Sequence, residues 1–73
     1  MTMLDSNFQR WVMHVGPDNL ARNLRCTKFS VYRWLRGERE PRITVRREIL
    51  RIADGAVSVE DIHTHFAQRM LTR

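Results

Sequence analysis

The sequence predicts an all-α protein, a compact five-helix bundle that forms a single domain over residues 1–73. Apolar residues recur every three or four positions almost throughout, which is the spacing of helices that bury one face. Glycine, proline and hydroxyl residues separate these runs, and such residues begin and end helices. A chain of 73 residues can bury only one small core, so we expect a partner subunit to support the fold.

The first two expected helices meet at Gly16. The first is capped by Asp5 or Ser6 and ends at Gly16. Pro17 suits the first position of the second helix, where its missing N–H has no helical partner to lose. The inward residues are Phe8, Trp11, Val12 and Val15 in the first helix, and Leu20, Ala21 and Leu24 in the second.

The third expected helix follows a short turn at Arg25 and Cys26, and Thr27 can cap it. Gly37 ends this helix, because glycine tolerates the left-handed conformation that is common after a last helical turn. Its inward residues are Val31, Trp34 and Leu35.

Two further helices complete the bundle. Pro41 prevents the third helix from continuing, and Thr44 can cap a fourth that stops at Gly55. The β-branched residues 43–45 leave a second interpretation open, a strand in a small wing. Ser58 and Asp61 have the spacing of a capping box at the start of a fifth helix over about residues 58–70. The inward residues are Val45, Ile49 and Ile52 in the fourth helix, and Val59, Ile62, Phe66 and Met70 in the fifth.

Positive charge is concentrated in the middle of the chain, whose total formal charge is +5. Residues 22–51 hold ten of the thirteen Lys and Arg residues and three of the eight acidic residues, so this segment carries +7 and the remainder −2. This distribution is typical of proteins that bind polyanions. Nearly all the cations are arginine, whose flat fork of donors fits phosphate and guanine. The alternative is a solvated basic face without a partner.

The second and third expected helices have the features of a helix-turn-helix that reads DNA. The second helix is short, offers the small residue Ala21 where another helix can approach, and is followed by a tight turn. The third helix turns long side chains outward. Arginine or lysine can donate to O6 and N7 of guanine, and an aromatic ring can contact a thymine methyl group. The outward residues are Lys28, Phe29, Tyr32, Arg33 and Arg36.

The residues from Pro17 to Leu24 and from Val31 to Pro41 resemble the phage repressor/Cro helix-turn-helix family. They are most similar to its small Cro-like regulators, in which this helix ends in Trp-Leu-x-Gly-x-x-x-Pro. The segment Gly55-Ala56-Val57-Ser58 is also similar to one that precedes the last helix in those regulators. The resemblance covers about residues 20–62. It implies the Cro/repressor fold, with the motif at about residues 17–37.

The resemblance also implies the residues of a DNA site. Positions that read bases correspond to Lys28, Phe29 and Arg33, with Tyr32 beside them. Positions that contact the DNA backbone correspond to Thr27, Arg36 and the loop with Arg39 and Arg42, and we expect Asn19 and Ser30 to contact the backbone as well. Two residues depart from the family pattern. Arg25 stands where glycine is common at positive φ, and Pro17 stands where a polar residue commonly contacts phosphate, which leaves that contact to Asn19 or to backbone N–H groups.

Nothing in the sequence indicates an enzyme, since there is no nucleophile–base pair, glycine-rich phosphate cradle or pair of carboxylates in an apolar setting. We expect no metal and no cofactor. Cys26, the single cysteine, and His14, His63 and His65 lack metal-ligand spacing, and we expect the histidines to be exposed or partly packed. A lone thiol fits a reducing compartment. No apolar run is long enough to span a bilayer, and the first residues lack the pattern of a signal peptide. The sequence therefore predicts a cytoplasmic or nucleoid protein of bacterial or phage origin that is not bound to a membrane.

We therefore expect a sequence-specific regulator of transcription, a repressor that binds an inverted repeat of double-stranded DNA as a homodimer. The expected dimer contacts are Ile62, Phe66 and Met70 of the fifth helix.

Two alternatives remain open. One is an antitoxin that represses its own promoter and whose toxin covers the fifth helix. The other is an excisionase-like architectural protein with a wing at residues 43–45. Non-specific RNA binding is disfavoured because few aromatic residues are free to stack on bases.

Overall fold

Five helices account for most of the chain in the computed structural model, which describes the backbone of residues 6–71 and the side chains of residues 6–69. The helices are α1 (Asn7–Val15), α2 (Pro17–Leu24), α3 (Lys28–Arg36), α4 (Ile43–Ala53) and α5 (Val59–Leu71). The described part of the chain contains no strand. Its radius of gyration is 11.2 Å. The all-α prediction and the five expected helices are confirmed.

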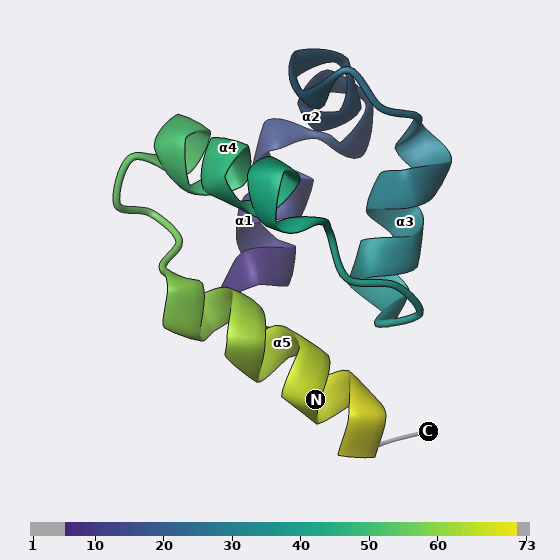
Figure 1. The fold of residues 1–73 in the computed structure, drawn as a ribbon, viewed down its shortest axis with the longest axis vertical. Coiled ribbons are helices and arrows are strands. Elements are labelled where there is room, and N and C mark those ends of the chain that lie inside the picture. The colour runs from purple at the N-terminus through teal and green to yellow at the C-terminus, as the bar shows by residue number, and fades with distance from the viewer. Residues whose placement is uncertain (1–5, 72–73) are drawn as a thin grey trace.

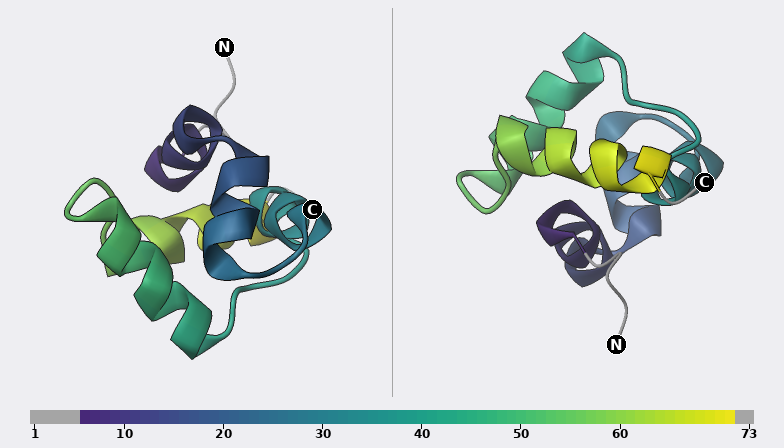
Figure 2. Two further views of the ribbon diagram at one scale, coloured as in Figure 1. Left: turned by 90° about the horizontal axis from the view of Figure 1, so that it is seen from above. Right: turned by 90° about the horizontal axis from the view of Figure 1, so that it is seen from below.

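The helices surround one core (Figure 1). α2 packs side by side with α3, and α1 packs on α5. α5 passes below the other helices, and its C-terminal end lies beside the end of α3 in both views of Figure 2. The buried apolar residues come from every helix and from the loop before α5. They are Phe8, Val12, Leu20, Ala21, Val31, Trp34, Ile49, Ala53, Val57, Ile62 and Phe66.

The first three helices begin and end as the sequence predicts. The hydroxyl of Ser6 accepts a hydrogen bond from the N–H of Gln9 at 3.0 Å and so caps α1. Gly16 has φ +97° between α1 and α2, and Pro17 is the first residue of α2. Thr27 caps α3 by accepting from the N–H of Ser30 at 3.2 Å. Gly37 ends α3 in the left-handed conformation with φ +75°.

The start of α4 differs from the prediction. Arg42 precedes the helix in an extended conformation and gives it no side-chain cap, so the expected cap at Thr44 is wrong. Residues 43–45 form the first turn of α4, which excludes a wing at these positions. The helix ends at Asp54, which is left-handed with φ +49°, one residue before the expected stop at Gly55.

The start of α5 is capped as predicted, but its buried face is rotated from the predicted one. The Ser58 hydroxyl accepts from the N–H of Asp61 at 3.1 Å, and the Asp61 carboxylate accepts from the N–H of Ser58 at 2.9 Å. Val59, expected inside, is 57% exposed. His65 and Arg69 are buried instead, at 0% and 8% exposure.

None of the described helices is long and apolar enough to cross a bilayer.

Candidate nucleic-acid interface

Helix α3 has a packed face and a free face. Val31 and Trp34 are 0% and 4% exposed and belong to the core. On the opposite side, Phe29 is 66% exposed and Tyr32 is 39% exposed. The two residues are spaced i and i+3, so their rings lie on the same face of the helix and form one exposed aromatic patch. The free face is formed by the residues predicted to point outward: Lys28, Phe29, Tyr32, Arg33 and Arg36.

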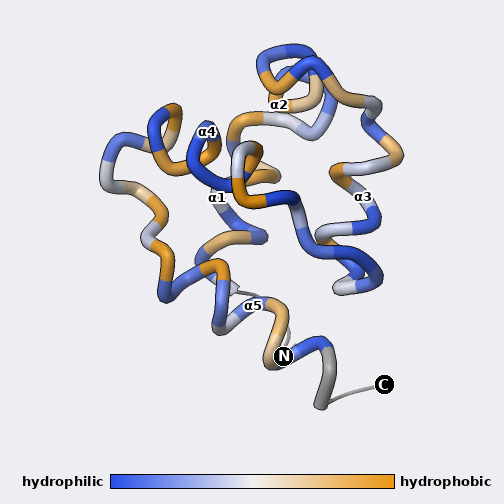
Figure 3. The backbone as a smooth tube through the Cα atoms, viewed as in Figure 1, coloured by the Kyte–Doolittle hydropathy of each residue, from blue (hydrophilic) through white to orange (hydrophobic). Residues whose placement is uncertain are grey.

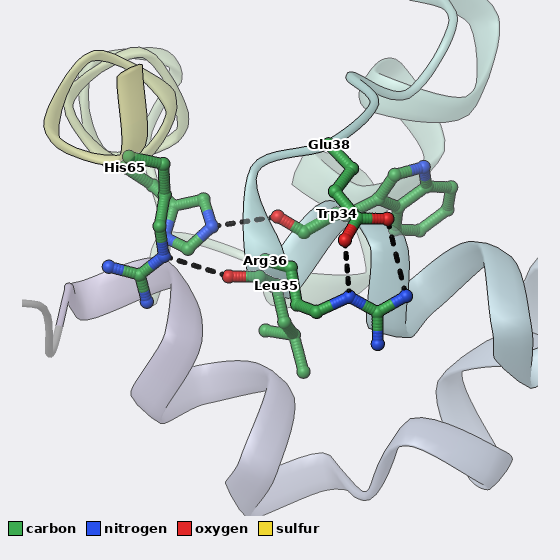
Figure 4. Close-up of polar contacts among 6 residues, drawn as sticks. Trp34, Leu35, Arg36, Glu38 and His65 are labelled. Atoms are coloured by element: carbon green, nitrogen blue, oxygen red, sulfur yellow. Dashed lines mark hydrogen bonds and ion pairs between the residues drawn. The ribbon is translucent and has the colours of Figure 1, made fainter. Parts of the chain in front are cut away.

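The charges of the free face differ in how far they are neutralised. Arg36 forms an ion pair with Glu38 at 2.8 Å, and this hydrogen bond raises the pKa of Arg36 above its usual range (Figure 4). Lys28 and Arg33 have no acidic partner among the described residues. The ammonium of Lys28 lies 6.0 Å from the centre of the Phe29 ring. The uncompensated charges thus lie on Lys28 in the first turn of α3 and on Arg33 in its last turn. Only Lys28 adds to the positive end of the helix dipole.

The turn before α3 places Arg25 in the left-handed region, with φ +57° and ψ +41°. The N–H of Arg25 donates to the carbonyl of Arg22, and the N–H of Cys26 donates to that of Ala21 at 3.0 Å. These two bonds form a Schellman motif, which glycine usually closes. The family pattern has glycine at positive φ here, and in this chain an arginine adopts that conformation. Burial raises the pKa of the Cys26 thiol, which agrees with an unreactive turn residue.

The polar residues expected at the DNA backbone flank α3 on both sides. Asn19 is exposed on α2, but its amide donates to the carbonyl of Val15 at 3.0 Å and so also caps the end of α1. Thr27 and Ser30 lie at the capped first turn of α3. Arg39 and Arg42 are exposed on the segment that joins α3 to α4, which is hydrophilic along most of its length (Figure 3). A groove of about 310 Å³ separates this segment from α3.

The C-terminal end of α3 is held by α5, which sequence reasoning did not predict (Figure 4). Nε2 of His65 lies 2.8 Å from the backbone carbonyl of Trp34. Nε of Arg69 donates to the carbonyl of Leu35 at 2.9 Å. Both carbonyls belong to the last turn of α3, where helical partners are few. The Trp34 carbonyl also accepts from the N–H of Gly37 at 3.0 Å, and α5 supplies an additional donor to each carbonyl.

His65 also connects α3 with the start of α1. A carbonyl only accepts, so Nε2 carries the proton and Nδ1 accepts from the hydroxyl of Ser6, 2.6 Å away. The ring lies edge-on to Phe8 and Phe66, with centroids 5.1 and 5.0 Å apart. Burial lowers the pKa of His65, and the nearby charge of Arg69 lowers it further. The expectation that His65 is exposed or partly packed is therefore wrong.

The sequence did contain a signal for this buried pair. Ile62, His65, Phe66 and Arg69 are spaced i, i+3, i+4 and i+7, which is the full inward stripe of a helix. The interpretation followed the apolar residues alone and so continued the stripe to Met70. The side chain of Met70 lies outside the described residues.

The predicted dimer contacts need correction. Ile62 and Phe66 are 2% and 5% exposed in the single chain, where they pack in the core. Side chains that are already covered have almost no surface to offer a second subunit, so these two residues cannot form the interface. Whether the chain dimerises through another surface stays a prediction.

Comparisons of the chain with protein-family models, with curated proteins and with solved structures give no match.

Proposed function

We propose that the chain binds double-stranded DNA by inserting the free face of α3 into the major groove, and that it regulates transcription. The observation that carries this proposal is the free face itself. It combines two exposed aromatic residues, Phe29 and Tyr32, with two cations that lack acidic partners, Lys28 and Arg33. Aromatic rings fit thymine methyl groups, and arginine or lysine fits the acceptors of guanine.

The dimensions of α3 support this role. Its nine residues correspond to a rod about 13 Å long and 10–12 Å wide. The major groove of B-DNA is about 12 Å wide, so one such helix fits into it. The packing of α2 against α3 leaves the first turns of α3 free to approach base edges, as in helix-turn-helix proteins.

Basic residues after α3 would hold the DNA backbone. Arg39 and Arg42 follow the helix, and both are exposed. Such cations position a protein on DNA without reading sequence, whereas contacts from α3 specify the bases. We therefore assign base contacts to Lys28, Phe29, Tyr32 and Arg33, and backbone contacts to Asn19, Thr27, Ser30, Arg36, Arg39 and Arg42.

Repression is the simplest mode of action for such a small domain, because a bound chain would block a promoter by occupying it. Binding as a homodimer to an inverted repeat would place one copy of α3 in each half-site, about one DNA turn apart. The interface would have to lie outside Ile62 and Phe66. The excisionase-like alternative required a strand at residues 43–45 and is not retained, because these residues are helical.

Selection of bound sequences from a pool of random duplexes tests the proposal. An enriched consensus is expected, and a palindrome within it would indicate a homodimer. Arg33→Ala should weaken binding to that consensus by about 1–3 kcal/mol and relax the preference at one base pair, while Arg39→Ala should weaken all duplexes alike. No enrichment, together with no duplex binding at low salt, would contradict the proposal. Recovery of a stoichiometric toxin with the chain from its host would favour the antitoxin alternative.

A further inference from the structure

Four arginines from three segments line one groove beside α3. Arg25 comes from the turn before the helix, Arg33 from the helix itself, and Arg39 and Arg42 from the segment that follows it. Trp34 and Pro41 also line the groove, and both are buried, so its wall is partly apolar. A cleft that gathers charge of one sign against a wall of low dielectric concentrates the electrostatic potential.

The acidic residue of the groove does little to compensate these charges. Glu40 lines the groove, but its carboxylate is paired with Arg46 at 3.3 Å. The four groove arginines form no ion pair among the described residues. The groove volume of about 310 Å³ would hold a phosphate group with several water molecules, since each water occupies about 30 Å³ of liquid.

Arg25 provides an independent observation. It has φ +57°, and it is one of two residues other than glycine with positive φ in the described chain. A side chain in this region strains the backbone, and glycine would relieve the strain without altering the turn. Backbone strain of this kind is concentrated at functional sites, where the strained residue persists because its side chain has a role. Here that side chain reaches the arginine groove.

We propose that this groove binds a phosphate group of the DNA backbone and that Arg25, together with Arg39 and Arg42, is a ligand of that phosphate. The inference rests on the proposed function and adds Arg25 to it, a residue to which neither the helical pattern nor the family resemblance gave a role. Guanidinium groups bind phosphate through paired hydrogen bonds, which suits a site formed by several arginines. Because α3 forms one wall of the groove, a phosphate held there would fix the depth of the helix in the major groove.

The variant Arg25→Gly separates the backbone strain at Arg25 from the contact of its side chain with phosphate. The substitution removes the strain, so the melting temperature should rise by a few degrees. It also removes one phosphate ligand, so the affinity for the selected duplex and for a random duplex should fall by a similar factor of about ten. The slope of log K against log salt should decrease by about 0.9, as expected for one lost phosphate contact.

Two variants serve as controls. Asp54→Gly relieves the other strained position, φ +49°, and removes a side chain that does not line the groove, so it should raise the melting temperature without weakening duplex binding. Arg10→Ala removes an exposed cation of α1 outside the groove. It should leave the affinity within about twofold, because a distant surface charge is screened by salt.

Titration with inorganic phosphate, followed by NMR of the arginine side-chain N–H signals, tests the groove without DNA. Saturable shifts at Arg25, Arg39 and Arg42 that Arg25→Gly abolishes would support the site. If Arg25→Gly binds the duplex as tightly as the wild type, the groove does not bind the DNA backbone and the assignment is overturned. If the wild type nevertheless shows the phosphate-induced shifts, the groove would bind a free phosphorylated ligand instead. Phosphate binding without any duplex binding would overturn the proposed function while leaving an anion site. The absence of both phosphate shifts and an effect on duplex affinity would overturn the inference.

Discussion

Nε2 of His65 donates a hydrogen bond to the backbone carbonyl of Trp34 across 2.8 Å, and through this bond α5 holds the last turn of α3. The same ring accepts from Ser6, which caps α1. A single buried imidazole therefore joins three helices that are far apart in the sequence. The ring contacts the C-terminal end of α3 through the backbone and is fully buried, so it takes no part in the free face.

Replacing His65 by alanine should lower the free energy of unfolding by about 3 kcal/mol. The change removes one of the two donors to the Trp34 carbonyl, which keeps the N–H of Gly37. It also leaves the hydroxyl proton of Ser6 without an acceptor and opens a cavity between Phe8 and Phe66. Urea denaturation measures the loss. His63 is exposed on the same helix, so His63→Ala should change stability by less than about 0.5 kcal/mol. Equal effects of the two substitutions would contradict the role given to His65.

Stability should fall as the pH drops below about 6.5. Burial lowers the pKa of His65 in the folded chain, whereas in the unfolded chain it is about 6.5. The folded chain therefore favours the neutral ring. The contribution of His65 to the free energy of unfolding is complete when the pH is above the pKa of the unfolded chain. It is lost progressively as the pH falls from there through the folded pKa, at up to about 1.4 kcal/mol per pH unit. Urea titrations at pH 7.5 and 5.5 test this. His65→Gln should remove most of the difference, and an unchanged difference would assign it to another group.

Gly37→Ala should destabilise the chain more than Gly55→Ala. Both glycines have positive φ, +75° and +95°, so alanine is strained at either position. At Gly37 an added Cβ would also collide with the side-chain stem of Arg69, whereas at Gly55 it would meet nothing within 4 Å. We expect about 1 kcal/mol for Gly55→Ala and about 2–4 kcal/mol for Gly37→Ala, the excess being the overpacking term. Thermal unfolding of the two variants gives the comparison, and equal shifts would show that α5 moves freely away from α3.

Phe29→Ala should separate binding from stability. The ring is 66% exposed, so its loss should change the free energy of unfolding by no more than about 0.5 kcal/mol. If it contacts a thymine methyl group, affinity for the selected duplex should fall by about 1–3 kcal/mol, with a smaller loss on random DNA. Fluorescence anisotropy with both duplexes provides the measurement. The same loss on both would indicate that Phe29 does not read sequence.

Local patterns were enough to predict most of the helices. Ser6, Thr27 and Gly37 act within a few residues of their own positions, so their capping roles follow from the sequence alone. The start of α4 was misplaced because Thr44 was given a capping role, whereas residues 43–45 already form the first helical turn despite their β-branched side chains. The environment of α4 decides that conformation, and it cannot be read from three residues.

The site was predictable only where it depends on a single helix. The outward residues of α3 follow from its period, whereas Arg25 departs from the family's glycine and its left-handed conformation is seen only in the structure. The arginine groove and the contacts of His65 and Arg69 depend on segments brought together by folding. His65 and Ser6 are 59 residues apart, and nothing in their local sequences indicates that they meet. Polar residues at inward helical positions were the one available sign, and a pattern based on apolar residues overlooked them.

The division of α3 between two faces also bears on how such a chain could evolve. Val31 and Trp34 secure the helix to the core, while Lys28, Phe29 and Tyr32 on the other side are exposed and do not belong to it. Mutations at the exposed positions can alter the preferred target while the fold stays intact. Under the proposed function, duplicated copies of this gene could acquire new targets through a few codon changes in one nine-residue helix.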